Sequence, residues 1–94
     1  MAETMATAEV AARLVRITGQ DQFLVEQLKD PLTRALGDRR SVYMVDVDTV
    51  GRVGQVLVSI SGLRGCLPLF FQPEELEPGY VFRVVKDTVA RFDF

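Results

Sequence analysis

The chain has 94 residues, 48% of them hydrophobic, which is enough for one folded domain with a single modest core. Its 11 basic and 13 acidic residues give a net charge of −2, without the basic excess that favours non-specific nucleic-acid binding. No apolar run approaches the roughly 18 residues of a membrane span, and residues 1–12 lack the basic and apolar regions of a secretory signal.

Cysteine and histidine usage limits the possible chemistry. Cys66 is the only cysteine, so an internal disulfide is impossible, which suits a reducing cytoplasm. The chain has no histidine, which excludes catalytic groups built on imidazole and removes the commonest ligand of protein metal sites. We therefore expect a cytoplasmic protein that is not an enzyme and that needs no metal or cofactor. Cys66 itself is expected to be a small buried apolar residue.

The segment 7–17 fits two elements. One is a helix capped by Thr7, which its alanine and arginine content favours. The apolar positions at helical spacing are Val10, Leu14 and Ile17. The alternative is a strand over residues 10–17, and Gly19 ends the element in either case.

The next segment predicts helix more clearly. Asp21 can cap it, and a leucine recurs at every fourth position, so the leucines share one face. These residues are Leu24, Leu28, Leu32 and Leu36. The Asp30-Pro31 step allows one kinked helix or two short ones, over residues 21–29 and 31–36, and Gly37 is a plausible C-cap.

From residue 41 onwards the pattern favours strands. The predicted strands cover residues 41–47, 53–60, 67–71, 80–85 and 88–94, and each is rich in β-branched and aromatic residues. Residues 61–65 predict a hairpin loop. Pro68 indicates that its strand lies at an edge or carries a bulge. Pro73 begins one predicted helical turn, and Pro78-Gly79 predicts a tight turn.

These elements predict an α+β fold in a single domain, residues 1–94. Residues 1–6 are expected to be flexible, residues 7–37 mainly helical and residues 41–94 β-rich. The expected architecture is an N-terminal helical segment followed by a five-stranded antiparallel sheet or a small β-barrel.

The order of elements in residues 53–94 resembles that of OB-fold domains in single-stranded-DNA-binding proteins. The resemblance rests on Gly54-Gln55-Val56-Leu57-Val58-Ser59-Ile60, a glycine-bearing hairpin, Leu67-Pro68-Leu69-Phe70-Phe71, a short Glu-Glu-Leu turn and the segment from Glu77 to Phe92. It implies stacking of bases on aromatic side chains beside a basic groove. The implied phosphate contacts are Arg52, Arg64, Arg83, Lys86 and Arg91, and the implied stacking residues are Tyr43, Phe70, Phe71 and Phe82. The alternative is that the phenylalanines fill the core.

Two surface features remain. In the predicted strand over residues 80–85, Val81, Arg83 and Val85 would point outward, and arginine beside apolar groups is typical of interface hot spots. Asp46 and Asp48 lie two positions apart, hence on one strand face, where they fit either a cation or acid–base site or an ordinary solvated strand.

The favoured function is therefore a non-catalytic protein-interaction module, such as a subunit, adaptor or inhibitor. Its expected partner is another protein or a second copy of the chain, with no membrane involved. The candidate binding residues are Arg52, Arg64, Val81, Arg83, Val85 and Arg91. A single-stranded nucleic-acid-binding protein is the alternative, although the net charge does not favour it.

Overall fold

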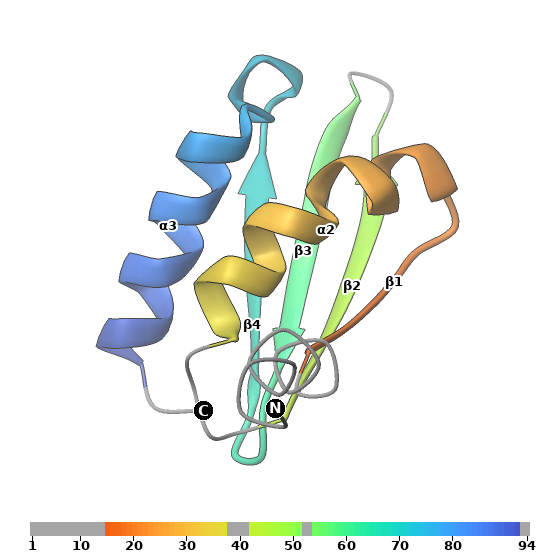
Figure 1. Ribbon diagram of the computed structural model, residues 1–94. Helices are drawn as coiled ribbons and strands as arrows, with labels where there is room; N and C mark the ends of the chain where they lie inside the picture. Colours follow the sequence, from red (N-terminus) through yellow and green to blue (C-terminus); the bar gives the residue numbers. More distant parts are fainter. Residues whose placement is uncertain (1–14, 38–41, 52–53, 93–94) are drawn as a thin grey trace, which may run out of the picture.

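A sheet and two helices form two layers in the computed structural model, which describes residues 15–37, 42–51 and 54–92 (Figure 1). In chain order the elements are β1 (Val15–Thr18), α2 (Gln22–Leu36), β2 (Tyr43–Val50), β3 (Gln55–Ser61), β4 (Cys66–Phe71), the 3-10 turn η1 (Pro73–Glu75) and α3 (Pro78–Arg91). The architecture is α+β, as expected, but the arrangement of its elements differs from the prediction.

The sheet is mixed and has four strands in the order β1-β2-β3-β4. β1 pairs with β2 in parallel, across the connection that contains α2, whereas β2–β3 and β3–β4 are antiparallel. The two outer strands, β1 and β4, do not pair with each other, so the sheet stays open. The expectation of a five-stranded antiparallel sheet or a small OB-like barrel is therefore wrong.

The predicted strands at residues 80–85 and 88–94 are also wrong, because residues 78–91 form α3. Pro78 occupies the first turn after the N-cap Glu77, where its fixed backbone angle favours a helix. Val81, Val85 and Val89 follow at four-residue spacing, and all three are buried. The helix-propensity cost of a valine is a fraction of a kcal/mol, about 0.5 or less, and burial of its side chain outweighs that cost.

The N-terminal prediction of a helix over residues 7–17 fails where it can be compared. Residues 15–18 form β1, and residues 7–14 lie outside the described part. Gly19 ends the strand as expected, and it has a packing role. A side chain at this position would overlap the carbonyl oxygen of Val47, so only glycine permits this approach of the chain to β2.

α2 confirms the helix predicted from Asp21 onwards and shows that it is one continuous element. The Asp21 carboxylate accepts from the backbone N–H groups of Phe23 and Leu24, at 3.0 and 3.3 Å. Pro31 lies inside the helix and cannot donate to the carbonyl of Gln27. The helix continues past it to the C-cap Gly37, and all four predicted leucines are buried.

The predictions for β2, β3 and β4 are confirmed, with bounds shifted by one to three residues. Alternate side chains of β2 and β3 are buried: Tyr43, Val45, Val47, Val56, Val58 and Ile60. The hairpin at residues 61–65 joins β3 to β4, and β4 is an edge strand, as Pro68 indicated.

Glu75 connects the end of β4 to the start of α3. One carboxylate oxygen accepts from the Gln72 backbone N–H at 2.8 Å, and the other accepts from the Tyr80 hydroxyl at 3.1 Å. The Tyr80 ring meets Phe71 edge-on, with centroids 6.3 Å apart. Donation to Glu75 favours the protonated phenol, so the pKa of Tyr80 lies above its usual value. These contacts fix the reversal of the chain from sheet to helix.

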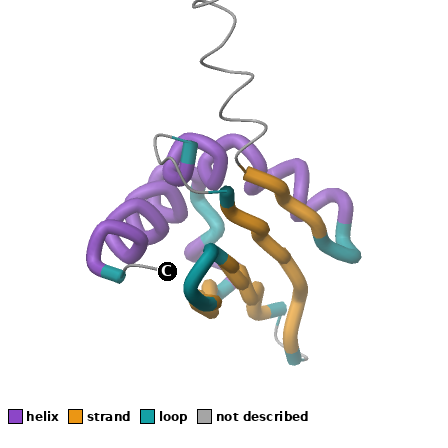
Figure 2. Tube along the Cα trace, turned by 90° about the horizontal axis from the view of Figure 1, so that it is seen from below, coloured by secondary structure: helices purple, strands orange, loops and turns teal. Residues whose placement is uncertain are grey.

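All the buried apolar side chains form one cluster between the sheet and the helices. α2 and α3 pack side by side, and Figure 2 shows both on the same side of the strands. The opposite face of the sheet has no described element over it. None of the described helices has the length and apolarity that a membrane crossing requires.

The helical register of α3 can be tested with Val85 and Arg83, which would share a face in a strand but do not in the structure. Val85 is fully buried and Arg83 is exposed. We expect Val85→Ala to lower the free energy of unfolding by about 1–3 kcal/mol, through lost burial and the cavity left behind. Arg83→Ala should change it by about 0.5 kcal/mol or less. Chemical denaturation measures both, and equal effects would contradict this register.

Candidate docking face

The sheet face that points away from α2 and α3 is called the open face here. Side chains along a strand alternate between the two faces of the sheet. The buried residues and the residues paired with them across the sheet therefore lie on the inner face, and the residues between them lie on the open face. The open face consists of Arg16, Thr18, Met44, Asp46, Asp48, Val50, Gln55, Leu57, Ser59, Ser61, Cys66, Pro68 and Phe70. Cross-strand pairing arranges them in rows across the sheet.

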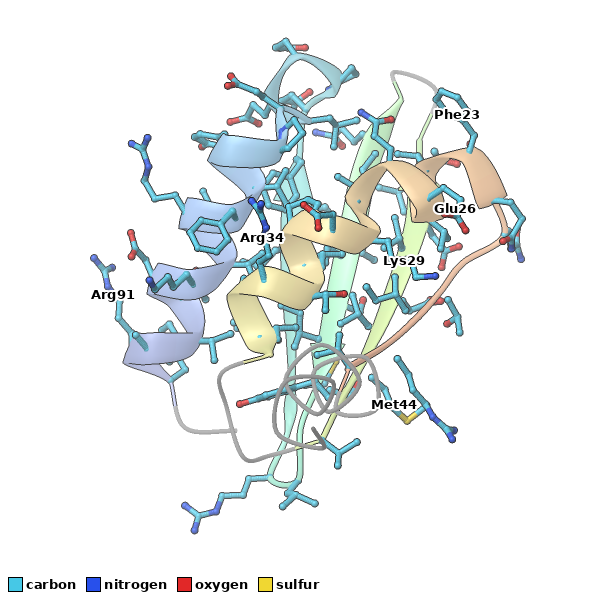
Figure 3. The ribbon with its side chains drawn as sticks, in the orientation of Figure 1. Phe23, Glu26, Lys29, Arg34, Met44 and Arg91 are labelled. Atoms are coloured by element: carbon cyan, nitrogen blue, oxygen red, sulfur yellow. The ribbon has the colours of Figure 1, made fainter. Side chains whose placement is uncertain are left out.

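Apolar side chains occupy the β3–β4 side of the open face. Leu57 pairs with Phe70, whose side chain is 60% exposed, and Pro68 lies next to it opposite Ser59. Met44, 58% exposed, lies at the other side and points away from both helices (Figure 3). Because cross-strand neighbours have Cβ atoms about 5 Å apart, Leu57 and Phe70 form one continuous apolar contact surface.

Asp46 and Asp48 lie beside this apolar surface, on the same face of β2, as the sequence predicted. Asp46 accepts from the Thr18 hydroxyl at 3.3 Å, and Asp48 accepts from the Gln20 backbone N–H at 3.4 Å. Asp48 lies directly across from Leu57 on β3. A binding partner with a positive charge beside an apolar group could therefore contact the Asp48 carboxylate and the Leu57 side chain at the same time.

The two carboxyl groups interact, and the result is a raised pKa for Asp46. The largest cause is the hydrogen bond between the two carboxyl groups, which requires a proton on one of them. Partial desolvation and repulsion by the Asp48 charge act in the same direction, whereas the Thr18 hydrogen bond lowers the pKa. A cation between the carboxylates would relieve this repulsion.

The described residues contain no group of three or more acidic, cysteine or histidine side chains able to hold a metal ion. Two carboxylates on an exposed sheet face are nevertheless suited to an ammonium or guanidinium group. The arrangement therefore favours binding of a cationic side chain over coordination of a metal.

β4 leaves one side of its backbone unpaired, and Pro68 restricts what can add there. The Gly62 N–H donates to the Gly65 carbonyl across the hairpin, and hydrogen-bonded and non-hydrogen-bonded pairs alternate from that point. Pro68 is then in a non-hydrogen-bonded pair with Ser59, so its ring nitrogen faces the free edge. The edge lacks a donor at its middle, which disfavours addition of another strand.

The sequence-predicted binding residues lie elsewhere in the structure. Val81 and Val85 are on the side of α3 that packs into the core, where both are fully buried, so the outward Val81–Arg83–Val85 stripe does not form. Arg83 and Arg91 are exposed on α3, and Figure 3 shows Arg91 projecting from the outer side of that helix. Arg64 is in the β3–β4 turn. Arg52 lies outside the described residues.

The four aromatic residues that the OB-fold resemblance implied for base stacking also lie in different parts of the structure. Tyr43 and Phe71 belong to the core, as the core-filling alternative predicted. Phe82 is half-buried, with the Lys86 ammonium 5.4 Å from its ring centroid. Only Phe70 among the four candidates combines substantial exposure with a place on the open face.

Several residues of the open face were not among the predicted binding residues. Alternation along β2 puts Met44 on the same face as the two aspartates, and alternation along β3 puts Leu57 on the face opposite the core. The sequence pattern could therefore have indicated both residues. Thr18 could not be found because its neighbour Asp46 is 28 positions away and pairs through parallel strands. Cys66, expected to be buried, is exposed at the end of β4.

Comparisons with protein-family models, with curated proteins and with solved structures find no match to this chain.

The interaction between Asp46 and Asp48 predicts a pH effect with a definite sign. Because the raised pKa belongs to the folded state, its contribution to stability is complete below the unfolded-state pKa of aspartate and is lost as pH rises through the raised value. We expect Asp48→Asn to lower the pKa of Asp46 and to remove this pH dependence. NMR titration of the Asp46 carboxyl carbon measures the shift. Asp87→Asn on α3 is the control, and an unchanged Asp46 midpoint in the Asp48 variant would refute the coupling.

Because Pro68 leaves the free edge of β4 without a central backbone donor, restoring that donor should change how the chain associates. Pro68→Thr restores a backbone N–H between those of Cys66 and Phe70, which gives the edge a continuous row of donors. We expect the variant to self-associate faster than the parent chain, as measured by light scattering at increasing concentration. Ser59→Thr places the same side chain on the neighbouring inner strand and should leave association unchanged. Equal behaviour of the two variants would exclude a protective role for Pro68.

Proposed function

We propose that this chain is a non-catalytic protein-interaction module whose open face docks onto another protein. The observation that supports this most is the in-register pair of half-buried Leu57 and exposed Phe70, on a sheet face that no described element covers. Full burial of a side chain such as Phe70 stabilises a complex by about 1.5–3 kcal/mol before the costs of association. Apolar groups surrounded by polar ones are the usual composition of such interfaces.

A binding role agrees better with the side chains of the open face than a catalytic role does. The chain has no histidine to act as acid or base near neutral pH. Asp46 is exposed on the sheet, without the exclusion of water that strengthens electrostatic catalysis. The interacting carboxylates therefore support recognition of a partner.

The same carboxylates favour a different protein over a second copy of the chain or a nucleic acid. A symmetric face-to-face pair uses the same patch on both copies. The open face carries Asp46 and Asp48 against one arginine, Arg16, so negative charges outnumber positive ones when two copies face each other. They would also repel a phosphate backbone at this face.

Photo-crosslinking at two exposed phenylalanines tests the proposal. Benzoylphenylalanine replaces Phe70 on the open face or, as a matched control, Phe23 on α2, which is 79% exposed. In cells that naturally make the chain, we expect position 70 to crosslink to one discrete different protein. Position 23 should give no crosslink to that partner protein. Adding Asp46→Arg should abolish the position-70 product.

The outcomes are distinct. A product of two joined copies from position 70 would identify self-association and contradict docking onto another protein. Identical products from both positions, or a nucleic-acid adduct from position 70, would also contradict the proposal.

A further inference from the structure

We propose that the partner segment on the open face is an amphipathic helix that presents a lysine or arginine beside apolar side chains. Its cation binds at Asp46 and Asp48, and its apolar side chains cover Leu57 and Phe70. This inference rests on the proposed function and adds the chemistry of the partner.

Charge complementarity identifies the cation. Asp46 and Asp48 receive hydrogen bonds from the Thr18 hydroxyl and the Gln20 backbone N–H, both uncharged donors. Arg16 lies on the same face, in register with Met44 and not with either aspartate. An ammonium or guanidinium group from a partner would add charge-assisted hydrogen bonds to these two carboxylates.

The spacing of the row indicates how the partner crosses the sheet. Asp48 pairs with Leu57, and Leu57 pairs with Phe70, so the three lie on adjacent strands. Strands are about 4.8 Å apart, which places Phe70 roughly 10 Å from Asp48. Helix positions i and i+7 are separated by about 10.5 Å along the axis, with i+3 and i+4 between them on the same face. A helix laid across the strands therefore matches the row.

The edge of the sheet argues against the other common mode of peptide binding. Strand addition requires a row of free donors and acceptors on an outer strand. Pro68 interrupts that row on β4, whereas it leaves the open face accessible. Beside β4, where Leu57 and Phe70 lie, the face is therefore the better surface for docking, and a helix is the element that satisfies its own backbone while lying on it.

A pair of synthetic helical peptides tests this inference on the full chain. The first presents lysine and leucine seven positions apart on one face. The second is identical except that glutamate replaces each lysine. Titration into the ¹⁵N-labelled chain should move the amide signals of Asp46, Asp48, Leu57 and Phe70 with the lysine peptide, and the glutamate peptide should bind at least about tenfold more weakly. Added salt should weaken the lysine peptide because the charges are exposed.

Single substitutions separate the two parts of the site. We expect Asp46→Asn and Asp48→Asn each to weaken the lysine peptide by roughly two- to fivefold, the size of an exposed ion pair. Phe70→Ala should weaken it by about tenfold or more, as for an interface hot spot. Asp87→Asn and Phe23→Ala are the matched controls. Of these five residues, four are exposed and Asp48 is half-buried, so the folded chain should tolerate these changes, which circular dichroism checks.

The failures of the two proposals are distinguishable. Equal affinity of both peptides for the open face would overturn the cationic partner while leaving the docking role intact. Signal changes confined to α2 and α3, or no binding by either peptide, would overturn the helical partner even if position 70 crosslinks to another protein. Loss of that crosslink would overturn the docking role itself.

Discussion

The packing of the α3 valines against α2 and the sheet determines the rest of the structure. Val81, Val85 and Val89 are buried in the same cluster as the four leucines of α2. Because residues 78–91 are used in this way, they are not available as strands, and the sheet formed by the described residues has four strands with β1 and β4 at its edges. Both helices take the same face, so the core is one-sided. The open face is a direct consequence of that arrangement.

The β4 edge and the open face must both avoid unwanted association, and they do so by different means. At the β4 edge, Pro68 removes the central backbone donor. On the open face, Asp46 and Asp48 place two interacting carboxylates next to Leu57 and Phe70. The edge is therefore protected by geometry and the face by charge. Only the second kind of protection can be reversed by a suitable partner.

Much of the sheet was predictable from the sequence, because alternation in β2 and β3 gives a period of two that fits only a strand. α3 was not, since Tyr80, Phe82 and Val84 fit alternation while Val81, Val85 and Val89 fit a helix. The β-branched composition favoured the strand, and tertiary packing reversed that preference. Pro78-Gly79, which resembles a turn, is the first turn of the helix. Of the open face, the sequence indicated that the aspartates share a side, but pairing with Thr18 and alignment with Phe70 depend on contacts between distant strands.

The position of the carboxylates explains how a face with apolar side chains can be selective in the binding that we propose. An apolar pair such as Leu57 and Phe70 alone would attract any exposed apolar surface, including that of another copy. Two neighbouring negative charges make like faces repel and make anionic partners unfavourable, which is discrimination against competitors. A cationic partner gains from the same charges, since it offsets the repulsion between the Asp46 and Asp48 carboxylates, which is one of the causes that raise the pKa of Asp46 after their hydrogen bond and desolvation. The electrostatic cost within the free protein is therefore what sets the chemistry of the partner that we propose.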